Sequence, residues 1–268
     1  MTPPALGGRL AAWGAPRMGR IGVLIGREVR RFMSEWPELI GGPGVNAAIY
    51  LAILAVAAAA PVGGPGGPAL ADFAAPGLIA ASAAFNAFLG PGFSIMEAKM
   101  SGAIQDDLAA PVSPLELALG HVAAGMAAGI VTGLFIFGVA ALFADLALDA
   151  ARLPAACLAL ALSCGAMAGL GAATGVWTRK WYGFAAVGGL GMMPLVMLSG
   201  VFFPLYALPP LAATAAAWGP IHPPVDLLRA AMIGTPATGP GLAPTALWAV
   251  LGLALACAAF TRTRPLRD

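Results

Sequence analysis

Two stretches of this sequence concentrate the side chains that could take part in chemistry. One runs from Glu97 to His121 and is the longest polar interruption of a very apolar chain. The other, HPPVDLLRAAMIG, carries His222, Asp226 and Arg229, the last two at helical i, i+3 spacing. A histidine beside a carboxylate could serve acid–base catalysis, and the three groups could form an outer gate in a membrane protein. The alternative that we favour is structural, an Asp–Arg pair with a nearby histidine that caps a short helix.

Nucleotide-binding and metal-binding patterns are absent from the sequence. The phosphate-binding motif GxxxxGK[ST] does not occur, and neither lysine follows a glycine. Cys157, Cys164 and Cys257 lie in apolar runs without a CxxC spacing, so we expect buried, reduced thiols. The first two are seven residues apart, which allows them to face the same side of one helix. We therefore predict no catalytic residue, no metal and no cofactor bound by this chain.

Composition places the chain among polytopic membrane proteins. Of its 268 residues, 60% are hydrophobic and 10% are charged, and its mean hydropathy is +0.87. In soluble domains about a quarter of the residues are charged. Six runs without charge are each longer than the roughly 20 residues that a helix needs to cross a bilayer. These runs are 39–71, 73–96, 117–144, 153–178, 181–225 and 230–261. We predict an all-α fold with six transmembrane helices.

The positions of the basic residues predict the orientation. Of the 14 Lys and Arg residues, all but Arg152 and Arg229 fall on one side of the six predicted crossings. The positive-inside rule then puts both chain ends in the cytoplasm, as an even number of crossings requires. No charged residue lies in the middle of a predicted crossing, where ion-coupled carriers usually place one. The energy for transport should therefore come from a partner, unless the flow is passive.

Four segments follow from this pattern. Residues 1–16 are expected to be a disordered tail, 17–36 an amphipathic interfacial helix, 37–261 the six-helix domain, and 262–268 a basic cytoplasmic tail. In the interfacial helix an apolar stripe lies opposite a basic stripe, which we expect to face lipid phosphates. The basic stripe consists of Arg20, Arg27, Arg30 and Arg31.

The first polar stretch predicts a short helix between two crossings. A helix fits Lys99–Leu108, and Pro111 and Pro114 must end it, because proline lacks the backbone donor. Ser113 should cap the following helix, with Glu116 in its first turn. The short helix would then lie across the axes of two long apolar helices.

The run 181–225 is too long for a single crossing. We expect the fifth crossing to end at LSGVFFPLYALPP and a short apolar helix to follow at Leu211–Trp218. Several prolines interrupt 204–234, which therefore predicts re-entrant outer-face helices between the fifth and sixth crossings. Asn86, in the second crossing, should face another helix rather than lipid.

Three segments resemble the type-2 ABC exporter permeases. EAKMSGAIQDDLAAPVSPLELALGH resembles their pattern of a charged lead-in, a glycine, an acidic residue and a proline-containing turn before the next helix. LSGVFFPLYALPP followed by HPPVDLLRAAMIG resembles their second signature, and the arginine-rich segment 17–36 is a third match. With six crossings and both ends inside, the resemblance covers nearly the whole chain.

The resemblance implies a permease that forms a dimer and binds two copies of a separate ATPase, on which ATP and Mg would bind. The helix at about 99–110 would be the coupling helix that contacts the ATPase. Its contacts would come from Glu97, Lys99, Gly102, Asp106 and Asp107. Substrate would pass between the two permease copies along the first, second and fifth crossings. Pathway candidates are Asn46, Tyr50, Asn86, Phe202 and Phe203, and outer-gate candidates are His222, Asp226 and Arg229.

We therefore predict the permease subunit of an ATP-driven exporter in the inner membrane. It would move an amphipathic, lipid-like or saccharide substrate outward, and the few mid-membrane aromatic residues favour a lipid-like cargo. Membrane lipids are expected partners, and nucleic acid is not. Two alternatives stay open at this point: an ion-coupled or passive secondary transporter, and a membrane-embedded enzyme that uses His222 and Asp226.

Overall fold

The computed structural model describes residues 18–34, 37, 41–57, 68–102 and 112–262, and every regular element in these ranges is helical. The all-α prediction is thus confirmed for the described residues. The elements are α2 (Met18–Ser34), α3 (Gly42–Ala57), α4 (Leu70–Ser101), α6 (Pro114–Ala140), α7 (Leu153–Trp177), α8 (Trp181–Ala186), the π-helix η2 (Val187–Met192), α9 (Met193–Leu198), the 3-10 helix η3 (Leu205–Ala207), α10 (Pro210–Ala217), α11 (His222–Met232) and α12 (Ala243–Arg262).

Five helical segments in the described residues are long and apolar enough to cross a membrane: α4, α6, α7, the continuous stretch Trp181–Leu198 and α12. The first predicted crossing corresponds to α3, which is apolar over Gly42–Val56 but shorter than the others. A helix rises about 1.5 Å per residue, so α3 is short for a hydrocarbon layer of about 30 Å. The five full-length segments lie where the second to sixth crossings were predicted.

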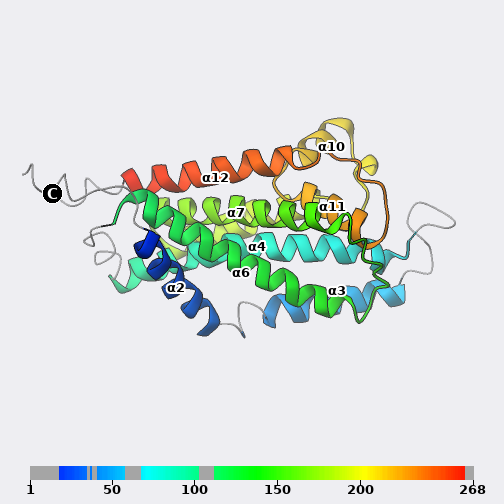
Figure 1. Ribbon diagram of the computed structural model, residues 1–268, viewed down its shortest axis with the longest axis horizontal. Coiled ribbons are helices and arrows are strands. Elements are labelled where there is room, and N and C mark those ends of the chain that lie inside the picture. The colour runs from blue at the N-terminus through cyan, green and yellow to red at the C-terminus, as the bar shows by residue number, and fades with distance from the viewer. Residues whose placement is uncertain (1–17, 35–36, 38–40, 58–67, 103–111, 263–268) are drawn as a thin grey trace, which may run out of the picture.

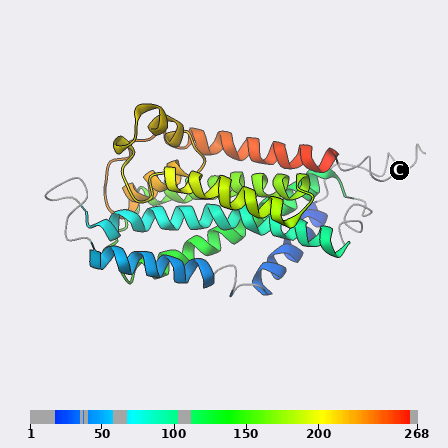
Figure 2. The same cartoon turned by 180° about the vertical axis from the view of Figure 1, so that it is seen from behind.

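The long helices run side by side, with α7 between α4 and α12 (Figures 1 and 2). α4 packs against α6 and α7, and α7 packs against α12. At one end of the bundle, here called the α2 end, α2 packs on α6 near the end of α4 (Figure 1). At the opposite end, the α11 end, α11 packs on α4 and α7.

Small residues allow this close packing. A Cβ added to Gly129 on α6 would lie 2.6 Å from the carbonyl oxygen of Ala83 on α4. One added to Gly171 on α7 would lie 2.0 Å from the carbonyl oxygen of Phe88. The helices therefore approach closely at these positions, whereas Gly138 on α6 faces open space.

The helix boundaries confirm one predicted end and correct another. Ser113 accepts a hydrogen bond from the Glu116 N–H and the Glu116 carboxylate accepts one from the Ser113 N–H, so the predicted cap is a complete capping box. The prediction that a new helix begins at Lys99 is wrong, because Lys99 lies in the last turn of α4. No Gly or Pro interrupts Met96–Ser101, so α4 continues to Gly102, whose φ of +80° ends it.

The structure also tests the short helices predicted in 204–234 and the predicted burial of the cysteines. Segment 204–234 forms the short helices η3, α10 and α11, with α10 one residue earlier than predicted; their placement in a membrane stays a prediction. Cys164 is buried as expected and all three thiols are free. Cys157, however, is exposed, so it does not share a side of α7 with Cys164.

Candidate functional site

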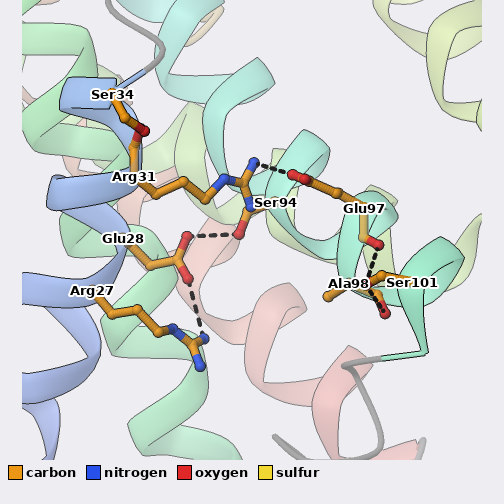
Figure 3. Close-up of polar contacts among 8 residues, drawn as sticks. All are labelled: Arg27, Glu28, Arg31, Ser34, Ser94, Glu97, Ala98 and Ser101. Atoms are coloured by element: carbon orange, nitrogen blue, oxygen red, sulfur yellow. Dashed lines mark hydrogen bonds and ion pairs between the residues drawn. The ribbon is translucent and has the colours of Figure 1, made fainter.

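Side chains from α2 and α4 meet in a polar contact at the α2 end (Figure 3). The Ser94 hydroxyl on α4 donates to Glu28 Oε2 on α2 at 2.6 Å. Arg31 Nη2 on α2 lies 3.0 Å from Glu97 Oε2 on α4. Arg31 thus faces protein rather than lipid phosphate, which corrects the prediction for this residue. The side chains of Arg27 and Arg30 are exposed, and their contact with lipid phosphates stays a prediction.

Glu28 is a buried carboxylate that sequence reasoning missed. Its side chain is 10% exposed, and Oε1 lies 3.1 Å from Arg27 Nη2. Burial by itself raises the pKa of Glu28, but His121, the Ser94 hydroxyl and the two arginines outweigh it, so the pKa falls below its ordinary 4.5. Glu28 is the only acidic residue of α2, and its position among arginines is the sequence feature that could have identified it.

Lys99 holds the end of α7. Its Nζ donates to the carbonyl oxygens of Gly175 at 2.7 Å and Thr178 at 2.9 Å, and also to that of Val176. The last carbonyl groups of a helix have no partner within the helix, so a cation there satisfies them and opposes the helix dipole. The side chain predicted to contact the ATPase is therefore engaged within the chain.

A cavity of about 970 Å³ opens beside this polar contact. Its polar side is formed by Arg31, Glu97 and Ser101, and its apolar side by Phe85, Leu89, Met100, Trp181 and others from α4 and α8. The wall is stabilised by Phe93, whose ring stacks on Trp181 at a centroid distance of 4.9 Å and packs edge-on against Phe184. The lining residues come from α2, α3, α4 and α8, which include the three crossings predicted to line the pathway.

The pathway candidates fall in two places. Asn86 lines the cavity, and its Nδ2 donates to Thr132 Oγ1 on α6 at 2.9 Å, so its predicted orientation toward another helix is confirmed. Tyr50 on α3 and Phe202 lie together, with ring centroids 5.8 Å apart. Asn46 is exposed on α3, and Phe203 is partly buried.

At the α11 end, Arg229 is buried and bonds only to backbone and ring. Its Nε donates to the Phe73 carbonyl at 2.9 Å, and Nη2 donates to the carbonyls of Gly200 at 2.6 Å and Val201 at 2.7 Å. Its guanidinium carbon also lies 3.6 Å above the centre of the Phe73 ring. Desolvation by burial lowers the pKa of Arg229 to about 10, which leaves it charged at neutral pH.

Asp226 and His222 also have partners other than Arg229. Asp226 Oδ2 accepts hydrogen bonds from the N–H groups of Thr238 and Gly239 at 2.9 and 2.8 Å. The predicted Asp–Arg pair is therefore wrong as a direct contact. His222 Nδ1 lies 2.9 Å from the Ser199 carbonyl, and because a carbonyl cannot donate, Nδ1 carries the proton. Nε2 of His222 is buried without a hydrogen-bond partner.

The arrangement at the α11 end is structural rather than catalytic. A cavity of about 560 Å³ lies beside His222, Asp226 and Arg229. The side chains of Arg229 and Asp226, however, form their hydrogen bonds with backbone groups. Desolvation by burial lowers the pKa of His222, so the ring is neutral at pH 7. Within the described ranges no group of three or more His, Cys, Asp or Glu side chains could hold a metal ion.

Residues 20–233 match the family model of the ABC-2 type transporters, which is more than half of the chain. The chain belongs to the ABC-2 type transporter family. It is similar to the inner membrane transport permease YadH of Escherichia coli strain K12, with 28% identity over 184 residues, 69% of this chain and 71% of the relative. YadH of Shigella flexneri gives the same values. The resemblance noted in the sequence is confirmed, and with five span-length apolar helices the chain is a multi-pass membrane transporter subunit rather than a catalytic enzyme.

For this ABC-2 family member, the structure places only part of the predicted coupling site. Asp106 and Asp107 lie outside the described residues. Glu97 and Lys99 lie near the end of α4, and each bonds to a neighbouring helix, α2 and α7 respectively. Sequence reasoning missed Glu28 and Ser94, which complete the contact between α2 and α4.

Proposed function

We propose that the chain is the permease subunit of an ATP-driven exporter in the inner membrane. In this proposal α3 is the first of six crossings, both chain ends lie in the cytoplasm, and two copies pair with two copies of an ABC ATPase. The cavity of about 970 Å³ at the α2 end carries the proposal, because it offers a substrate site to a member of a transporter family.

The cavity suits an amphipathic, lipid-like substrate. Its volume lies within the roughly 300–1,000 Å³ of small-molecule sites. The Glu97 side chain is 62% exposed, and an exposed ion pair contributes little, about 0–1 kcal/mol, so Arg31 and Glu97 can exchange partners with a polar headgroup. The aromatic wall around Phe93 would take the apolar part. An extended saccharide remains the second substrate class.

Energy would reach this site through the segment that follows Gly102. The sequence has no phosphate-binding loop, so ATP and Mg would bind to the partner ATPase. Asp106 and Asp107 would contact that ATPase, at the end of the bundle where α4 also carries Glu97. Met100 and Ser101 of α4 line the cavity, so the cavity lies beside the helix to which the force would be passed.

The second permease copy would cover the apolar face of α3. Val45, Ile49, Ile53 and Val56 are 63%, 53%, 56% and 89% exposed on this helix. Lipid or a second copy can cover such a face, and the family resemblance favours the copy. A short first crossing is also better tolerated where a neighbour shields its ends from lipid.

The test is a pull-down of the tagged chain in mild detergent, with mass spectrometry and an ATPase assay of the co-purifying proteins. We expect a stoichiometric ATPase that is lost on Asp106→Ala with Asp107→Ala. The matched control is Asp145→Ala, an exposed acid after α6 outside the proposed coupling segment, which should retain the ATPase. A chain that purifies alone and transports without ATP would overturn the proposal.

A further inference from the structure

The last turn of α4 is bonded to two other helices at once. Glu97 holds Arg31 of α2, and two residues later Lys99 holds the carbonyl groups at the end of α7. The Lys99 partners lie 76 to 79 residues further along the chain, so this bond joins separate elements rather than capping its own helix. α7 ends there at Trp177, and α8 begins at Trp181.

The corner between α7 and α8 meets α4 through one polar contact and through aromatic contacts, which include the stack of Phe88 on Phe184. The polar contact is that of Lys99 with the end of α7, and Phe93 also stacks on Trp181. Phe93 and Lys99 are six residues apart on α4, or about 9 Å along the helix axis. The polar attachment at Lys99 and the aromatic contacts together resist rotation of the corner against α4 more than the aromatic contacts alone.

Lysine suits this attachment better than a neutral side chain. Its ammonium group has three donors, and three carbonyl oxygens accept from it here. Bonds from a charged donor are roughly twice as strong as neutral ones. The side chain is partly buried, which reduces competition from water.

We propose that Lys99 is a positioning residue that makes the α7–α8 corner, and with it the Trp181 wall of the cavity, move together with the end of α4. The proposal rests on the proposed function in that the force enters after Gly102. A push on that segment then changes the cavity wall directly. Without Lys99, only the aromatic contacts would transmit the movement of α4 to Trp181, and less transport would follow each ATP hydrolysed.

The first test measures the attachment in the permease alone. Spin labels at Met100→Cys and Tyr182→Cys, both strongly exposed positions, report the distance between α4 and α8 after Cys157, Cys164 and Cys257 are replaced by alanine. We expect a narrow distance distribution in the parent, a clearly broader one in Lys99→Met, and a narrow one in Lys99→Arg, which keeps the charge and donors. Unchanged width in a folded Lys99→Met protein would refute the proposal.

The second test uses the complex with its ATPase in vesicles. We expect Lys99→Met to keep ATP hydrolysis within about twofold and to lower the amount of a fluorescent phospholipid analogue moved per ATP by about tenfold, which corresponds to about 1.4 kcal/mol. The matched control is Lys180→Met, the same change at the other, exposed lysine. If transport and hydrolysis fall by the same factor, Lys99 is only a helix cap and the proposal fails. If no ATPase co-purifies, the proposed function is refuted. The role of Lys99 in attaching the corner to α4 is then decided by the spin-label distances alone.

Discussion

Replacing Arg229 by methionine should destabilise the bundle strongly. The residue is 5% exposed, and its guanidinium donates to three carbonyl groups in two other segments of the chain, Phe73 and Gly200–Val201. A hydrogen bond from a charged group contributes about 1.5–3 kcal/mol, and a buried carbonyl left without a donor costs about 1–3 kcal/mol. Part of this is offset, because burying the charge was itself unfavourable.

The net loss that we expect for Arg229→Met is about 3–5 kcal/mol, the range for breaking a buried charged network. In a protein of this size that corresponds to a fall in Tm of about 10 °C. Thermal unfolding in detergent, followed by fluorescence and by loss of the monodisperse peak in size exclusion, measures it. Arg229→Lys should lose less, because the ammonium keeps the charge and can reach some of the same carbonyl groups.

Arg152 provides the matched control. Its side chain is 50% exposed and pairs with Asp149 on the surface, where an ion pair contributes about 0–1 kcal/mol. Nη1 also donates to the Ala230 carbonyl at 3.1 Å, which is one bond to a carbonyl against the three of Arg229. Arg152→Met should therefore change Tm by no more than about 2 °C. Equal shifts of Tm for Arg229→Met and Arg152→Met would show that the buried hydrogen bonds of Arg229 add no stability, which would refute the prediction.

Two further predictions concern pH and packing. Burial lowers the pKa of His222 below its ordinary 6.5, so the unfolded chain binds a proton at a higher pH than the folded one. The stability that comes from the neutral ring is therefore present above pH 6.5 and is lost as the pH falls below it. Melting temperatures measured across this pH range should show the loss, and His222→Asn should remove it. An acid limb of the same size in the variant would contradict it. Gly171→Ala should lower stability by about 1–3 kcal/mol, because its Cβ would lie 2.0 Å from the Phe88 carbonyl, while Gly138→Ala, in open space, should be neutral or slightly stabilising. Equal melting temperatures for the two alanine variants would contradict the packing argument.

Local rules predicted much of the fold. The uncharged runs located all five span-length helices, because a bilayer demands about 20 apolar residues whatever lies around them. Ser113 and Glu116 marked the start of α6, since a capping box is formed by residues three apart. The break before Lys99 was placed too early, because the polar composition was interpreted as the start of a new helix, whereas α4 ends only at Gly102.

The candidate site was harder to predict, because its partners are distant in sequence. The residues around Lys99 in the sequence do not predict its hydrogen bonds to the end of α7. Likewise, the sequence around Arg229 does not predict that it bonds to the Phe73 carbonyl, 156 residues away, rather than to Asp226. The i, i+3 spacing only permitted an Asp–Arg contact; the three buried carbonyl groups offered the guanidinium more bonds out of water.

The sequence alone thus determined the class of protein, the positions of the apolar helices and the family resemblance. These depend on composition and on short-range patterns that act through the membrane as solvent. Tertiary structure decided the distant partners of three charged side chains: Glu28 with Ser94, Lys99 with α7, and Arg229 with Phe73. A buried charge must find compensating groups wherever the packed helices present them, and packing is set by the whole chain.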